Sequence, residues 1–166
     1  MLSEATTNIA APVSLADYTR LELIVPLLRE RDTAGIISEL SHILQNQGGV
    51  PDVLPFYQAA LNQELLANSA LDTGLALPHA RLSGVKQLQF AFGRTPDPVV
   101  WCGRSSWQVQ LIFLLAVPAT DVAGYLHLLA SLARLGQRPE LLAQLRVADT
   151  AEAILAVLDR IRLRQG

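Results

Sequence analysis

Residues 73–81 have the sequence TGLALPHAR. Small and large side chains alternate from Gly74 to Leu77, which is the period-two pattern of a short strand with one packed face. The small positions would let a helix lie close against the other face. Pro78 has no N–H for a further ladder bond and keeps the residue before it extended, so we expect the strand to stop there. The sequence therefore predicts that His79 is presented at the end of a strand.

The imidazole of His79 is a candidate nucleophile. A neutral imidazole, with a reference pKa of about 6.5, has a free nitrogen lone pair at cellular pH. A lone histidine is more often a solvated residue or one whose ring nitrogens are already hydrogen-bonded. The residues around His79 must therefore decide between this ordinary role and a nucleophile. The nucleophile hypothesis predicts a ring that solvent reaches, in a shallow and partly apolar depression, with Leu75 and Leu77 buried. A ring enclosed in the core would contradict it.

The remaining metal-binding and cofactor signals are weak. His42 and His127 share no metal-ligand spacing with each other or with His79, and Cys102 is the only cysteine. The chain contains no Gly-x-Ser-x-Gly elbow, no Gly-x-Gly-x-x-Gly turn and no phosphate loop. We therefore expect no metal and no cofactor, and we expect His42 at the surface or boundary of a helix.

Composition favours one globular domain that stays in the cytoplasm. The chain has 166 residues, of which 51% are hydrophobic and 17% are charged, with a net charge of −2. This charge gives no reason to expect nucleic acid or a membrane surface as a partner. The apolar run at residues 111–117 is far shorter than the roughly 20 residues of a membrane span. A single cysteine and the lack of a signal-peptide pattern predict a cytoplasmic location without membrane insertion.

Strand and helix patterns are interleaved along the chain, which predicts an α/β fold. We expect a loosely ordered arm over residues 1–17 and a single domain over residues 18–166. Residues 109–117 are almost entirely apolar and predict a strand that is buried on both faces. The other expected elements are strands at 21–25, 87–93 and 99–101, a turn at 95–98, and helices at 33–47, 53–66, 121–135, 139–145 and 150–163.

The core Ala-Leu-Pro-His-Ala at residues 76–80 resembles the phosphohistidine signature of a known family. This family is the enzyme IIA domains of the fructose/mannitol class in the bacterial sugar phosphotransferase system, together with their nitrogen-regulatory paralogue. The resemblance extends over residues 23–158, more by pattern than by identity. It implies a mixed sheet with helices on both faces. It also implies that His79 accepts a phosphoryl group from the phosphohistidine of the carrier protein HPr and passes it to an enzyme IIB domain or a regulatory target.

The resemblance places supporting residues before the histidine, and several depart from the family pattern. The family often has an Arg-Glu pair where this chain has Gln63 and Glu64. A Gly-Ser-Thr-Gly loop is usual where this chain has Ala-Asn-Ser-Ala, so Asn68 and Ser69 take the places of the hydroxyl residues. We expect both to help hold the phosphoryl group.

A second histidine commonly follows the buried strand in this family, and the alignment places Tyr125 there. His127 comes two residues later, about 200° around a helix, so it should not substitute, whereas Tyr125 could donate a hydrogen bond. Arg81 either adds positive charge at the site or is a solvated arginine.

Two functions of different classes follow from this pattern. The first is a phosphoryl carrier that uses His79. The second is a regulatory or docking module that keeps the enzyme IIA fold but is phosphorylated slowly or not at all. A hydrolase with His79 as general base has less support, because no carboxylate or nucleophile is placed beside it by the sequence.

Overall fold

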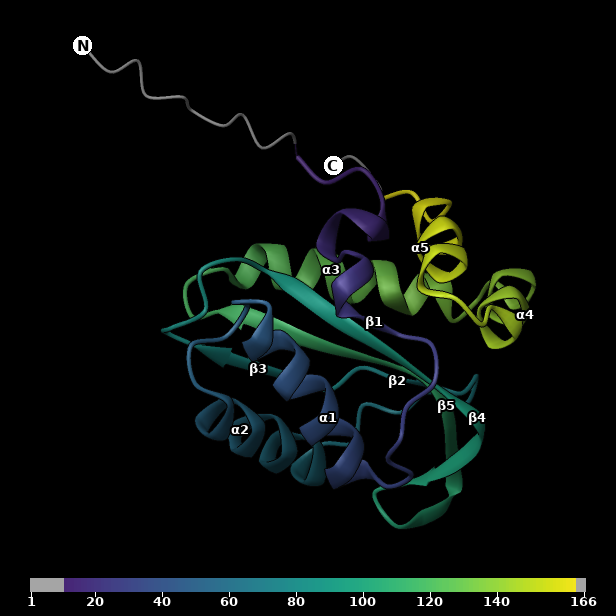
Figure 1. Ribbon diagram of the computed structural model, residues 1–166, viewed down its shortest axis with the longest axis horizontal. Coiled ribbons are helices and arrows are strands. Elements are labelled where there is room, and N and C mark those ends of the chain that lie inside the picture. The colour runs from purple at the N-terminus through teal and green to yellow at the C-terminus, as the bar shows by residue number, and fades with distance from the viewer. Residues whose placement is uncertain (1–10, 164–166) are drawn as a thin grey trace.

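A five-stranded mixed sheet lies between two layers of helices in the computed structural model, which describes residues 11–163 (Figure 1). Helices α1 and α2 cover one face, and α3, α4 and α5 cover the other. The predicted α/β fold with helices on both faces is confirmed. The elements are η1 (Leu15–Tyr18), η2 (Leu21–Leu23), β1 (Ile24–Val25), α1 (Thr33–Asn46), α2 (Val53–Leu66), β2 (Leu75–Ala76), β3 (His79–Leu82), β4 (Gln89–Trp101), β5 (Arg104–Pro118), α3 (Val122–Leu135), α4 (Pro139–Val147) and α5 (Ala151–Asp159).

Four of the five helices begin at a side chain that accepts a backbone N–H of the first turn. Asp32, Asp52, Asp121 and Thr150 precede α1, α2, α3 and α5 respectively, and each accepts such a hydrogen bond. Short polar side chains satisfy N–H groups that otherwise have no partner at a helix start. The predicted starts of these helices are confirmed.

The long hairpin of β4 and β5 forms the centre of the sheet. The two strands pair in antiparallel fashion around a turn at Cys102 and Gly103, which have φ angles of 52° and 68°. Strand β1 pairs in parallel with β4 at one edge, while β2 and β3 pair in parallel with β5 on its other side. Residues 111–117 of β5 are all buried, as their apolar sequence predicts.

Strands β2 and β3 follow β5 in one register, and Pro78 lies between them. Leu75 is opposite Leu111, and His79 is opposite Leu115. The carbonyl of Pro78 accepts a hydrogen bond from the N–H of Leu115 at 2.9 Å. A proline removes a donor but keeps its acceptor, so the chain stays beside β5 across Pro78 while the ladder is interrupted between β2 and β3. Strand β2 ends at Ala76, so the prediction that the strand stops at Pro78 is confirmed. The difference from the expectation is that a second strand, β3, begins at His79, which is therefore the first residue of the next strand.

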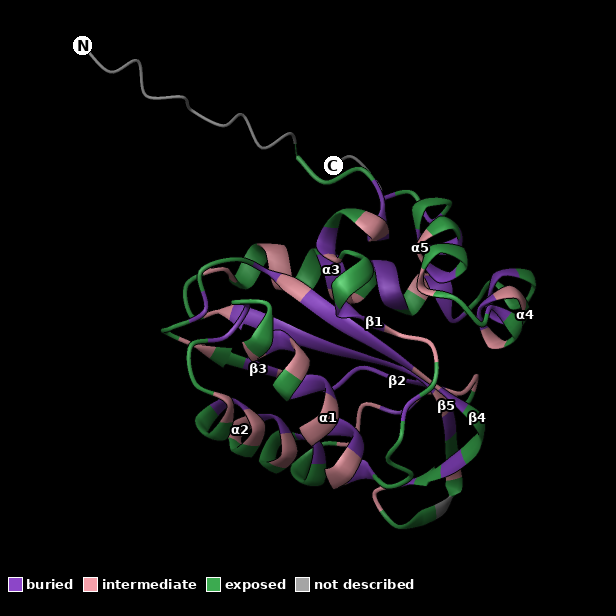
Figure 2. Cartoon of the chain, viewed as in Figure 1, coloured by how far each residue is buried: buried purple, intermediate pink, exposed green. Residues whose placement is uncertain are grey.

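The alternation of small and large residues sorts this strand between the two halves of the core. Leu75 and Leu77 are buried against the layer of α3, α4 and α5, as expected. Ala76 and Ala80 are buried on the other face, in the cluster that contains Phe56 of α2. Figure 2 shows the buried strands between helices whose outer faces are exposed. The small residues therefore allow α2 to pack close to the segment that carries the histidine.

The buried face of helix α2 is not the face that carries its last two leucines. Phe56, Ala60 and Glu64 are buried at a spacing of four residues, which is one helical face. Leu65 and Leu66 of the same helix are 61% and 85% exposed, although both are apolar. Because residue 64 occupies the inner position of this turn, residues 65 and 66 point away from the core, although both are leucines.

Two other boundaries differ from the expectations. The predicted turn at residues 95–98 lies inside β4, where the pairing shifts from Arg94 opposite Leu111 to Val99 opposite Val109. Extra residues here form an irregularity in the strand and do not reverse the chain. The first ten residues of the predicted arm lie outside the described residues, but residues 14–17 belong to the fold, since Leu15 is fully buried.

Within residues 11–163, no helix combines the length and the apolar character that crossing a bilayer requires.

Candidate functional site

A pocket of about 400 Å³ opens where β3 begins, between the two helix layers. Strand β3 is an edge strand that pairs with β5. Helices α2 and α3 lie on opposite faces of the sheet, and both approach the first residue of β3. The lining side chains come from all four elements: Ala59 and Gln63 of α2, His79, Ala80 and Arg81 of β3, Val117 of β5 and Tyr125 of α3.

The ring of His79 is half-buried in this pocket and lies beside Tyr125. The hydroxyl oxygen Oη of Tyr125 is 3.2 Å from Nε2 of His79 and 3.5 Å from Nδ1, and the two ring centroids are 4.9 Å apart. A phenol can donate to a neutral imidazole nitrogen. The expected solvent-reachable and partly apolar depression is therefore present.

Burial lowers the pKa of His79 below its ordinary value of 6.5. The Leu77 backbone and the negative charge of Glu64 raise it in part, while the positive charge of Arg81 lowers it further. Burial raises the pKa of Tyr125 as well, so its hydroxyl keeps its proton at neutral pH. The site therefore holds a neutral imidazole with an available lone pair and a hydroxyl donor next to it.

Three of the five expected supporting residues meet at His79, namely Gln63, Arg81 and Tyr125. Gln63 and Arg81 are exposed, so each can reach a ligand bound in the pocket. Among the described residues no carboxylate forms an ion pair with Arg81, because the ion pairs found there involve Arg20 and Arg138. The arginine beside His79 is thus available to an anion.

Asn68 and Ser69 do not line the pocket, contrary to our expectation. The Ser69 hydroxyl accepts the N–H of Leu77 at 2.8 Å and donates to Oε1 of Glu64 at 2.8 Å. The side chain of Asn68 accepts the N–H of Ala70 at 2.7 Å. Both side chains stabilise the loop that precedes the histidine strand, so their contribution to the pocket is indirect.

Glu64 is buried behind the pocket, and the sequence placed it only as the neighbour of Gln63 in the family's Arg-Glu pair, with no role expected for it. Its side chain is 2% exposed and lies one position away from Gln63 on α2. The signal that could have found it is the spacing of four from Phe56 and Ala60, which places residue 64 on the inner face.

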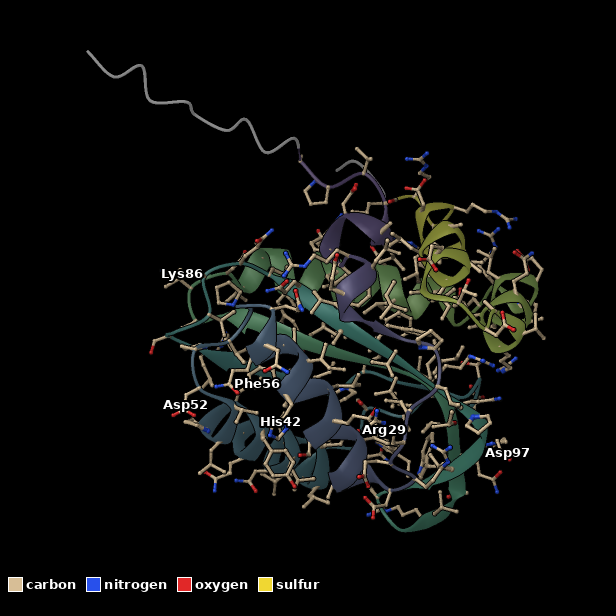
Figure 3. The ribbon with its side chains drawn as sticks, viewed as in Figure 1. Arg29, His42, Asp52, Phe56, Lys86 and Asp97 are labelled. Carbon is tan, nitrogen blue, oxygen red and sulfur yellow. The ribbon has the colours of Figure 1, made fainter. Side chains whose placement is uncertain are left out.

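The two other histidines lie away from the pocket. His42 is exposed on α1, in the layer of helices that lies below the sheet in Figure 3, and its Nδ1 bonds the carbonyl of Ser38 at 2.8 Å. His127 is exposed on α3, two residues beyond Tyr125, and does not line the pocket. The prediction that His127 does not replace Tyr125 agrees with this geometry.

The fold and the pocket define a class of protein: a small α/β domain with an accessible imidazole and, within the described residues, no carboxylate in the lining of its pocket. Residues 17–161 match the model of a family described as "Phosphoenolpyruvate-dependent sugar phosphotransferase system, EIIA 2". The chain belongs to this family, as the resemblance of residues 76–80 predicts.

Relatives in this family have two kinds of name. The chain is 30% identical over 149 residues to a nitrogen regulatory protein of Bradyrhizobium diazoefficiens, covering 87% of this chain and 94% of that one. It is 29% identical over 135 residues to the fructose-specific EIIABC component of Bacillus subtilis, covering 80% of this chain. The matched region spans 21% of that longer relative, so this chain corresponds to about a fifth of it.

Solved structures have the same fold. The nitrogen regulatory protein IIA-Ntr of Neisseria meningitidis superposes with a TM-score of 0.73 at 27% identity, covering 87% of this chain and 98% of that one. The IIA mannitol domain of Escherichia coli superposes with a TM-score of 0.72 at 18% identity, covering 84% of this chain and 98% of that one. At that identity the second likeness concerns the fold alone.

Proposed function

We propose that this protein is a phosphoryl carrier that holds the group on His79. In this proposal His79 accepts the group from the phosphohistidine of HPr and passes it to an enzyme IIB domain or to a regulatory target. The observation that carries the proposal is the ring of His79, which is half-buried, has a lowered pKa and lies beside a hydroxyl donor and the cationic Arg81.

The transfer needs positioning and charge stabilisation more than covalent chemistry from the protein. A lone pair of the neutral His79 ring attacks phosphorus, the N–P bond of the donor breaks, and the donor imidazole leaves as the neutral base. One imidazole replaces another, so no net proton is consumed. The hydroxyl of Tyr125 and the guanidinium of Arg81 are placed to donate to the phosphoryl oxygens.

The comparisons support both kinds of acceptor in this proposal. A solved complex from Escherichia coli contains enzyme IIA of the mannitol system with phosphorylated IIB. Other relatives are named as nitrogen regulatory proteins. An enzyme IIB domain and a regulatory target therefore both stay within the proposal.

A second candidate function is a docking module whose site is phosphorylated slowly or not at all. Gln63 and Tyr125 are neutral at the two positions where the family has arginine and histidine, which leaves fewer cationic donors in the pocket. Arg81 opposes this alternative, because it supplies one cation that no acid of the described residues neutralises.

Incubation with phosphoenolpyruvate, enzyme I and HPr is the experiment that tests the carrier function. We expect intact-mass measurement to find one added phosphoryl group, which acid removes because phosphorus on a histidine nitrogen is acid-labile. Omitting HPr is the control and should leave the protein unmodified. A protein that stays unmodified in the complete mixture would contradict the carrier function and leave the docking module.

An Arg81→Gln variant is expected to accept the phosphoryl group about tenfold more slowly, since a charge-assisted hydrogen bond becomes a neutral one. The rate is measured in a single turnover from phosphorylated HPr. Arg104→Gln is the matched control, because Arg104 lies at the opposite end of β5 from the pocket. Equal slowing in both variants would show an effect of net charge on docking with no role for Arg81 at the site.

A further inference from the structure

Glu64 is a carboxylate in the core with three hydrogen-bond donors on one oxygen. Its Oε1 accepts the N–H of Ser69 at 2.9 Å, the hydroxyl of Ser69 at 2.8 Å and Nε1–H of Trp101 at 2.7 Å. No lysine or arginine of the described residues forms an ion pair with it. Burial of a carboxylate costs free energy unless hydrogen bonds satisfy its oxygens, so the three contacts offset the burial of Glu64 and indicate a structural role for it.

The hydrogen bonds of Glu64 lead through Ser69 to the backbone two residues before the histidine. The hydroxyl of Ser69, which donates to Glu64, accepts the N–H of Leu77 at 2.8 Å. Leu77 lies two residues before His79, in the gap between β2 and β3. In this gap Pro78 can only accept a hydrogen bond from β5, so the backbone that enters His79 has one fewer tie to the sheet than a regular strand. The bond to Ser69 supplies a tie on the outer side of the strand.

The charge of Glu64 also acts on the imidazole. Its negative charge raises the pKa of His79, against the lowering by burial and by Arg81. The other polar groups that face the ring are neutral at pH 7, namely Gln63 from α2 and the hydroxyl of Tyr125 from α3. The imidazole ring itself gains positive charge as its nitrogen bonds to phosphorus, so the anion that raises the pKa of this ring also favours the positive charge on the ring.

We propose that Glu64 is the positioning residue of His79, holding the backbone before the histidine through Ser69 and stabilising the ring through its charge as the phosphoryl group arrives. The role rests on the proposed carrier function. Glu64 then has two effects, one on the position of the backbone and one on the charge of the ring, and separate variants can test each.

Glu64→Gln separates charge from geometry, because an amide oxygen at the same place can still accept all three hydrogen bonds. We expect the fold to be retained, the NMR titration midpoint of the His79 ring to move further down, and the phosphoryl transfer rate to fall about tenfold. Ser69→Ala removes the hydroxyl's hydrogen bonds to Leu77 and to Glu64 but keeps the negative charge of Glu64. It should slow transfer while it leaves the midpoint of His79 where the wild type has it.

Glu39→Gln is the matched control for Glu64→Gln. Glu39 is also a carboxylate that accepts backbone N–H groups, but it lies on α1 and its hydrogen bonds go to Arg29 and Glu30, away from the loop before His79. This variant should change neither the titration of His79 nor the transfer rate.

The titration and the transfer rate test separate parts of the proposal. If Glu64→Gln leaves both at the wild-type value, the proposal is overturned. If Glu64→Gln does not fold, Ser69→Ala decides, and an unchanged transfer rate in that variant overturns the positioning role. If the wild type accepts no phosphoryl group, the carrier function fails, while the shift of the His79 midpoint still shows whether the charge of Glu64 acts on the ring.

Discussion

A His79→Ala variant is expected to take up no phosphoryl group, because the substitution removes the only imidazole that the described residues contribute to the pocket. Gln63, Arg81 and Tyr125 would remain, but none of them is a neutral nitrogen nucleophile at pH 7. The measurement is intact mass after incubation with phosphoenolpyruvate, enzyme I and HPr. A loss of the adduct to below the detection limit is the expected result.

The other histidines are the controls for this variant. His42→Ala and His127→Ala should each keep the full adduct, because both residues are exposed and lie outside the pocket. An adduct that survives in His79→Ala and disappears in His127→Ala would show that the phosphoacceptor lies on α3. Circular dichroism should show the same helix content in all three variants, since none of these side chains is buried in the core.

The double variant Gln63→Arg with Tyr125→His is expected to transfer the phosphoryl group faster than the wild type, on the order of 10- to 1000-fold. Both changes restore cationic donors at the positions that line the pocket with His79. A charge-assisted hydrogen bond contributes roughly 1.5–3 kcal/mol, against about 1 kcal/mol for a neutral one. Gaining the upper part of that difference, about 1.4 to 2 kcal/mol, once or twice gives the stated range.

The rate of the double variant must be measured in a single turnover from phosphorylated HPr, so that docking and chemistry separate. Tyr125→Phe is the control, because it removes the hydroxyl 3.2 Å from Nε2 and leaves the aromatic ring. If the wild type already transfers as fast as the double variant, Tyr125 and Arg81 supply the stabilisation that the substitutions were meant to restore. The docking-module alternative then loses its main support.

Local signals predicted much of this fold. The helix starts at Asp32, Asp52 and Asp121 follow from the need to satisfy N–H groups at a helix end. The apolar run in β5 predicts a strand with neighbours on both sides, and the sheet provides them. The alternation at Leu75 and Leu77 predicts their burial, because side chains two residues apart in a strand point to the same face of the sheet.

The remaining features depend on partners that are distant in sequence. A second strand begins directly after Pro78 because β5 offers a donor at Leu115, which no local pattern around the proline reveals. The Ser69 hydroxyl bonds Glu64 of α2 and the N–H of Leu77 and does not line the pocket, and these partners lie five and eight residues away in the sequence. The meeting of Gln63, Arg81 and Tyr125 at His79 was predicted only through the family resemblance, since four separate elements must pack before these side chains are neighbours.

The indole of Trp101 is fully buried, and its N–H ends on the same carboxylate oxygen that holds Ser69. The protein therefore contains an optical reporter inside its own core. The fluorescence of a buried indole depends on the charge and hydrogen bonding of its acceptor, and Trp107 is the only other tryptophan in the chain. In a Trp107→Phe protein the tryptophan fluorescence would come from Trp101 alone. This fluorescence would report changes in the hydrogen bonding of Glu64, and so in the loop before His79, without an attached label.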